Sequence, residues 1–119
     1  MKQTETGIPG QFELKDHAEQ ERHVVMLGGE LDIASAPMLE AKVRELCAGG
    51  ASAIVVDLSG LSFIDSTGLR MLLSAQSLCH EQACDFALVP GQKNVQRLFA
   101  LTGLLEHLPF QANGSKPTA

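Results

Sequence analysis

The segment Leu61–Leu69 (LSFIDSTGL) places a hydroxyl residue, Ser66, where a strand is expected to pass into a helix. The first turn of a helix offers free backbone N–H groups and the positive end of the helix dipole, and both favour an added anion. Gly68 follows in that turn although glycine costs about 1 kcal/mol against alanine in a helix, which indicates that something approaches the backbone closely. A phosphate on Ser66 could be partly stabilised by this helix end and would alter the surface without unfolding the domain. Periodicity alone favours the alternative, that Ser66 simply caps the helix.

The other reactive side chains show no catalytic or metal-binding pattern. The sequence has neither a G-x-S-x-G nucleophile motif nor a G-x-x-x-x-G-K-[ST] phosphate loop. No two histidines lie four residues apart, and no Cys/His spacing is typical of zinc. The histidines are dispersed, and the first two are expected to flank an exposed hairpin: His17, His23, His80 and His107. We therefore predict no catalytic residue, no metal and no cofactor.

The three cysteines, Cys47, Cys79 and Cys84, form no C-x-x-C pair and are odd in number. This argues against a disulfide framework and is typical of a reducing compartment, so we expect small core residues. The first ten residues lack the apolar stretch of a signal peptide, and no apolar run approaches the ~18 residues that a membrane span needs. We predict a cytoplasmic protein without membrane contact.

The net charge of −5, with basic residues scattered and no Trp or Tyr, makes direct nucleic-acid binding a poor hypothesis. A protein partner with a basic patch is compatible with this charge.

Hydrophobic periodicity predicts one domain over residues 11–110, between a flexible tail at 1–10 and a disordered tail at 111–119. Strands are expected over Phe12–Asp16, His23–Leu31, Ser52–Leu58 and Asp85–Val89, with a further short one at His107–Phe110 left open. A turn is expected at Ser59–Gly60. Helices are expected from Ser35 to the stop signal Gly49–Gly50, over Ser66–Gln82, and over Gln92–Thr102.

The order β-β-α-β-α-β-α predicts a small single-domain α/β fold with a mixed sheet and its helices packed mainly on one face. Interaction sites in such folds tend to lie at the carboxyl ends of strands. The segments Gly29–Ser35 and Leu61–Leu69 occupy that position after the second and third strands, so we expect them to be neighbours.

Several motifs together resemble the STAS domain of bacterial anti-sigma factor antagonists. They are GELD at 29–32, SAP at 35–37, LSFIDSTGL at 61–69, and VQRLF at 95–99 followed by TGL at 102–104. The resemblance covers about residues 12–110, in the right order and spacing. The D-S-T-G-L block is the most specific part because it coincides with the strand-to-helix junction.

The resemblance implies that Ser66 is phosphorylated by the anti-sigma factor, itself a serine kinase that uses ATP. The unphosphorylated protein would bind that kinase and free a sigma factor, and a serine phosphatase would reset Ser66. Thr67 is a second candidate acceptor, while Asp65 and Gly68 would hold the loop geometry. The implied partner-binding residues are Asp32, Ser35, Asp65, Ser66, Thr67 and Gly68.

Three points stay open in the sequence. The same fold also serves as a non-phosphorylated interaction subunit of a transporter or signalling assembly. A nucleotide-sensing module is a third class, because a helix N-terminus can hold a phosphate. Asp32 could cap the first helix or line the interface.

A monomer is the expected oligomeric state.

Overall fold

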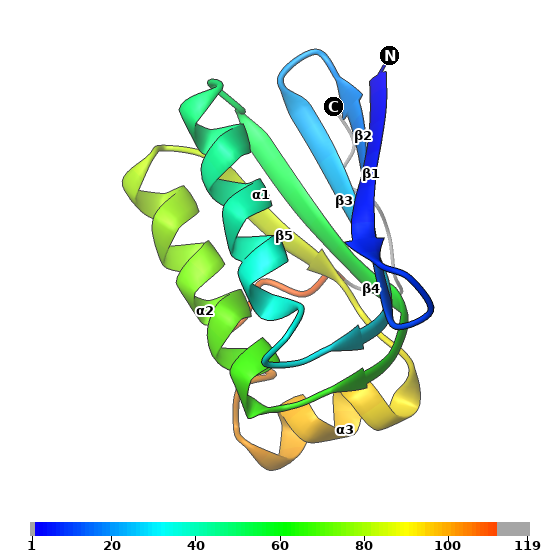
Figure 1. The fold of residues 1–119 in the computed structure, drawn as a ribbon. Coiled ribbons are helices and arrows are strands. Elements are labelled where there is room, and N and C mark those ends of the chain that lie inside the picture. The colour runs from blue at the N-terminus through cyan, green and yellow to red at the C-terminus, as the bar shows by residue number, and fades with distance from the viewer. Residues whose placement is uncertain (1, 112–119) are drawn as a thin grey trace.

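The computed structural model describes residues 2–111, which form a mixed β-sheet and three α-helices (Figure 1). The elements are β1 (Lys2–Ile8), β2 (Phe12–Glu19), β3 (Arg22–Leu31), α1 (Ala36–Ala48), β4 (Ala53–Ile64), α2 (Ser66–Glu81), β5 (Asp85–Val89) and α3 (Lys93–Leu101). The sheet order follows the chain, β1-β2-β3-β4-β5. Pairing is antiparallel from β1 to β3 and parallel from β3 to β5, which confirms the predicted mixed sheet.

The predicted flexible tail at residues 1–10 is wrong, because β1 pairs with β2 along its whole length, from Lys2 opposite Ala18 to Ile8 opposite Phe12. Pro9 and Gly10 make the turn between them. Gly10 has a φ of +76°, and the Gln11 N–H donates to the Ile8 carbonyl at 2.9 Å. This is the geometry of a tight turn with proline followed by glycine. An edge strand is paired on one side only and needs few apolar side chains, so its polar composition resembles that of a tail.

The turn predicted at Ser59–Gly60 is also wrong, since β4 continues through both residues to Ile64. The β3–β4 ladder instead shifts register between Met26 and Gly28 and again between Gly29 and Glu30. Bulges of this kind absorb extra residues without ending a strand. The strand therefore carries the chain directly to Asp65, without an intervening loop from Leu61.

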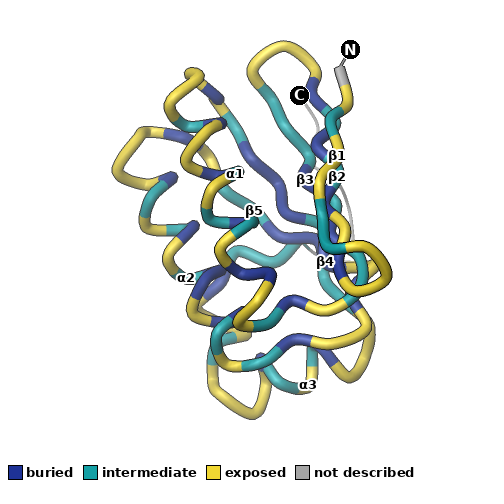
Figure 2. The backbone as a smooth tube through the Cα atoms, in the orientation of Figure 1, coloured by how far each residue is buried: buried dark blue, intermediate teal, exposed yellow. Residues whose placement is uncertain are grey.

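Helices α1 and α2 lie side by side on one face of the sheet, whereas α3 lies beyond the carboxyl ends of β3 and β4 (Figure 1). The core is the layer between the sheet and the first two helices, as the buried stretches of β4 and of both helices show in Figure 2. Fully buried side chains of this layer include Leu39, Val43, Ile54, Val56, Leu72 and Ala75. Burial of such a layer is the main favourable term in folding.

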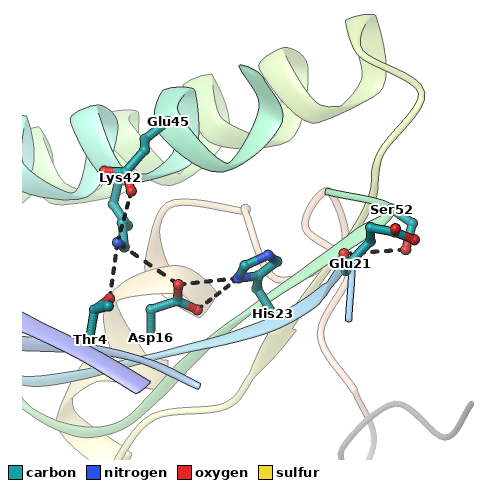
Figure 3. Close-up of polar contacts among 7 residues, drawn as sticks. All are labelled: Thr4, Asp16, Glu21, His23, Lys42, Glu45 and Ser52. Carbon is teal, nitrogen blue, oxygen red and sulfur yellow. Dashed lines mark hydrogen bonds and ion pairs between the residues drawn. The ribbon is translucent and has the colours of Figure 1, made fainter. Parts of the chain in front are cut away.

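A charged side chain, Asp16, is buried beside this layer and ties α1 to the antiparallel strands (Figure 3). Asp16 Oδ1 lies 2.9 Å from His23 Nδ1, and Asp16 Oδ2 lies 3.8 Å from Lys42 Nζ. Lys42 Nζ also donates to Thr4 Oγ1 at 3.2 Å. His23 was expected beside an exposed hairpin, but it is half-buried. His23 lies opposite Ala18 on β2 and opposite Ile54 on β4. Because both of these residues are buried, the His23 side chain lies on the face of the sheet that the helices cover.

At the far end of the described chain, Phe110 forms a single parallel bridge with Leu88 in place of the short strand left open at 107–110. The Gln111 N–H donates to the Leu88 carbonyl at 2.8 Å, so Gln111 is part of the fold and not of a tail. The rest of the predicted C-terminal tail, 112–119, lies outside the described residues. None of the described helices has the length and apolar character needed to cross a membrane.

Candidate functional site

The chain leaves the sheet at two adjacent points, after β3 and after β4. The parallel ladder between these strands runs to Glu30 opposite Phe63 and Leu31 opposite Ile64. One step further, the Asp65 N–H donates to the Leu31 carbonyl at 3.2 Å. The residues following β3 and β4 therefore lie next to each other, as the sequence predicted from the shared polarity of the two strands.

Ser66 is the first residue of α2 and is exposed to solvent. Across residues 2–111, its hydroxyl makes no hydrogen bond. The helix is capped by Asp65 instead, whose Oδ1 accepts from the Gly68 N–H at 3.0 Å. The alternative that Ser66 itself caps the helix is therefore wrong, and the Ser66 side chain is available for another purpose.

Gly68 is buried at the point where α2 meets the ends of β3 and β4. A Cβ atom there would lie 2.7 Å from the Leu31 carbonyl oxygen and 2.8 Å from Ile64 Cγ1. Both distances are shorter than real Cβ contacts. The close approach that the sequence indicated is thus made by this chain's own backbone. Thr67, the other candidate acceptor, is half-buried beside it.

The turn from β3 into α1 is held by Asp32 and Ser35. Asp32 Oδ1 accepts from the N–H groups of Ala34 (3.0 Å) and Ser35 (3.2 Å). The Ser35 hydroxyl donates to the Glu30 carbonyl at 2.7 Å and accepts from the Asp32 N–H at 2.9 Å. Ser35 is only 1% exposed, so its side chain shapes the turn and offers no contact to a partner. Asp32 supports the turn into α1 and, being half-buried, still reaches the surface.

Two apolar side chains at this edge were not predicted as site residues. Ile33 is 74% exposed and Phe63 is 46% exposed, on the turn after β3 and near the end of β4. The first turn of α3 contacts β4 next to Phe63, because Asn94 Nδ2 donates to the Ser62 carbonyl at 2.7 Å. In the sequence, each of the two apolar residues directly follows an Asp or a Ser. This pattern is too common to identify a residue as part of a binding site. Exposed apolar side chains gathered at one edge are typical of a protein–protein contact.

The charges around Ser66 are mainly negative. Asp65 precedes it, and Glu30 and Asp32 stand at the end of the neighbouring strand. Arg70 is exposed one helical turn further along α2, a spacing at which two side chains on a helix can meet. Of the histidines, His23 and His80 lie at the opposite ends of β3 and α2 from this edge, so neither can act as a base for Ser66.

A second cluster lies at the carboxyl end of α2. The sulfur atoms of Cys47, Cys79 and Cys84 all lie within 4.8 Å of one another. The sequence predicted three separate core residues and no metal-ligand spacing. It missed their meeting because they come from α1, from α2 and from the loop after α2.

Comparison with known proteins is consistent with this geometry. A family model of the STAS domain matches residues 15–115. The anti-sigma-F factor antagonist RsfB of Mycobacterium tuberculosis is 36% identical over 81 residues, which cover 68% of this chain and 66% of RsfB. This chain therefore matches somewhat less than two thirds of the length of that relative.

Two solved structures share the fold over most of this chain. The crystal structure of an anti-sigma factor antagonist from Mycobacterium paratuberculosis superposes with a TM-score of 0.75 at 27% identity, covering 91% of this chain and 92% of that one. The Bacillus cell fate determinant SpoIIAA in its phosphorylated form superposes with a TM-score of 0.64 at 25% identity, covering 86% and 92%.

Proposed function

This chain belongs to the STAS-domain family, and we propose that it is an anti-sigma factor antagonist switched by phosphorylation of Ser66. In this proposal the unphosphorylated form binds an anti-sigma factor that is also a serine kinase, and binding releases a sigma factor. Phosphorylation by that kinase abolishes the interaction, and a serine phosphatase restores it. The protein acts as a cytoplasmic monomer in this scheme.

The observation that carries the proposal is the exposed, unbonded Ser66 hydroxyl at the start of a helix that Asp65 already caps. A kinase can reach this oxygen without opening the fold. The phosphate would sit beside the first-turn N–H groups of α2, and Arg70 lies within reach one turn away. Both features favour a phosphate on the free domain, so the modification is compatible with the folded state.

The surface around Ser66 supports partner binding by the unmodified form. Ile33 and Phe63 provide exposed apolar area next to the two turns. Glu30 pairs with Phe63 in the β3–β4 ladder, and Asp32 and Asp65 lie in the two turns, so this edge also carries negative charge, which suits a partner surface carrying Lys or Arg. The partner-binding set is therefore extended by Ile33 and Phe63, while Ser35 and Gly68 act by holding the two turns in place.

Phosphorylation would weaken this contact for an electrostatic reason. A complex that covers Ile33 and Phe63 also removes water from Ser66, and a phosphate dehydrated beside Asp32 and Asp65 costs several kcal/mol unless cations meet it. Each ~1.4 kcal/mol is a factor of ten in affinity. We therefore expect phosphorylation to lower affinity by about two to four orders of magnitude.

The test is to incubate the protein with ATP and the cognate anti-sigma kinase, locate the phosphate by mass spectrometry, and titrate both forms against the kinase. We expect one phosphate, on Ser66, and none on Ser66→Ala. Ser74→Ala is the matched control, because Ser74 is an exposed serine on the same helix. Equal affinities of the two forms, or a phosphate elsewhere, would contradict the proposal. Tight binding without phosphorylation would instead indicate the role of a constitutive interaction subunit.

A further inference from the structure

Three elements meet at the end of α2 that lies away from Ser66. Cys47 comes from the last turn of α1, Cys79 from the last turn of α2, and Cys84 from the loop that joins α2 to β5. Their sulfur atoms all lie within 4.8 Å of one another, and the Cys47 and Cys79 sulfurs are 4.0 Å apart. We propose that this cysteine triad binds one thiophilic metal cation, of the Zn²⁺ or Cu⁺ type.

The spacing of the sulfur atoms suits a metal better than a disulfide. Zinc–thiolate bonds are about 2.3 Å long, so sulfurs that share one cation lie roughly 3.8–4.0 Å apart. The Cys47–Cys79 distance of 4.0 Å already has this value, and the remaining pairs need at most about 1 Å of contraction. A disulfide between Cys47 and Cys79 would require their sulfur atoms to approach to about 2.05 Å, roughly half of their present separation.

The surroundings of the triad indicate how the cation would be held. Cys79 is fully buried and Cys84 is 6% exposed, whereas Cys47 is half-buried and faces solvent in part. No His, Asp or Glu of the described residues joins the cluster. A three-coordinate Cu⁺ would need no further ligand, and a tetrahedral Zn²⁺ would take a water on the Cys47 side. Soft thiolate ligands select these two ions over Mg²⁺ or Ca²⁺.

Binding exchanges protons for metal. Burial raises the pKa of the Cys79 and Cys84 thiols, which favours the neutral thiol at both positions in the metal-free protein. A divalent cation that takes all three sulfurs forms three metal–sulfur bonds and releases three protons to solvent, leaving one net negative charge. The ligands are deprotonated by the cation itself, as is usual for metal-bound cysteine.

The consequence for the protein is a cross-link between α1, α2 and the start of β5. A cation bound only by the folded chain stabilises that chain by mass action. The triad lies about 20 Å along α2 from Ser66, given 1.5 Å per helical residue. Metal binding is therefore expected to raise the melting temperature without changing the surface around Ser66.

The test is to titrate the reduced, metal-free chain with Cd²⁺ and follow thiolate-to-metal charge-transfer absorption. The sequence has three cysteines in all, so this signal reports the triad alone. We expect saturation at one equivalent, about three protons released per cation, and a higher melting temperature. Competition by Zn²⁺ and by Cu⁺ then ranks the two ions.

Cys47→Ala tests the site with the smallest disturbance to the core, because Cys47 is the most exposed of the three. We expect at least a hundredfold weaker Cd²⁺ binding, while Ser77→Ala, an exposed neighbour of Cys79, binds like the parent chain. If the variant does not fold, alkylation of the parent chain decides, since Cd²⁺ should slow the alkylation of Cys47, the one thiol of the triad that is not buried. An unchanged alkylation rate of Cys47, no saturation at one equivalent, or equal binding by Cys47→Ala would overturn the proposal.

Discussion

The two ends of helix α2 present opposite environments on one rigid element. At its amino end, Ser66 is exposed, directly follows the capping residue Asp65 and lies next to the turn that Asp32 holds. At its carboxyl end, Cys79 is fully buried against sulfur atoms from two other elements. Because the exposed end is open to modification and the buried end is packed, we expect a modification at the amino end to alter binding and a substitution at the carboxyl end to alter stability. Substitutions at the two ends should therefore change different measurements.

The largest effect is expected from charge at the amino end. Ser66→Ala should bind the kinase within about threefold of the parent chain, whereas Ser66→Asp should bind roughly 10- to 100-fold more weakly, since one charge imitates a phosphate incompletely. Both should keep the melting temperature of the parent, because an exposed substitution rarely changes stability by more than ~0.5 kcal/mol. Titration calorimetry and thermal unfolding measure the two quantities. A fall in melting temperature that parallels the loss of affinity would contradict the expectation that the amino end of α2 affects binding and not stability.

Gly68→Ala should give the largest loss of stability at the amino end. The added Cβ would meet the Leu31 carbonyl oxygen at 2.7 Å, which is backbone and can move little. Overpacking of this kind costs about 1–3 kcal/mol, and we expect a value near ~2 kcal/mol in urea unfolding. Ser74→Ala serves as the control and should stay within ~0.5 kcal/mol of the parent. An unchanged unfolding midpoint would show that the junction of α2 with β3 is looser than its contacts imply.

Cys79→Ser should reduce stability at the carboxyl end while leaving kinase binding unaltered. The serine hydroxyl would be fully buried among apolar groups and thiols, at a cost of about 1–3 kcal/mol. Measured with a chelator present, the free energy of unfolding should fall by roughly 2 kcal/mol. The rate of Ser66 phosphorylation should match that of the parent chain. A slower phosphorylation rate would mean that the two ends of α2 are coupled.

The smallest effect is expected at Asp65, where two variants distinguish the contribution of its capping hydrogen bond from that of its negative charge. Asp65→Ala removes the bond to the Gly68 N–H and should cost about 1 kcal/mol, whereas Asp65→Asn keeps a good capping residue and should cost less. Both remove one negative charge beside Ser66, so both should reduce the affinity lost on phosphorylation. Urea unfolding and kinase titration of the two variants measure these changes. Equal stabilities of the alanine and asparagine variants would contradict the capping role.

Much of the amino-end site could be predicted because its signals are local. The change from strand to helix at Asp65–Ser66 is visible in the hydrophobic period, and the same period predicts β3 and β4 as neighbouring parallel strands. The wrong predictions at this end concern which of several neighbouring residues makes a given hydrogen bond or contact. Asp65 caps α2 in place of Ser66, and Ser35 is buried, because hydrogen bonding in a turn depends on backbone geometry that residue type alone leaves open.

Features that depend on distant parts of the chain were missed. Residues 2–8 form a strand only because β2 offers them a partner, and His23 meets Asp16 only once the hairpin packs under α1. The exposure of Ile33 and Phe63 follows from how two turns leave the sheet. Periodicity within a segment carries no information on these contacts.

Short-range patterns of apolar, capping and turn residues were enough to predict the order of most elements, the mixed sheet and the position of Ser66 at a helix start. The tertiary structure alone decided that Cys47, Cys79 and Cys84 meet, and that Gly68 lies against the backbone of β3. The physical reason is that packing brings together residues far apart in the chain, at distances that only the folded arrangement of helices on the sheet specifies.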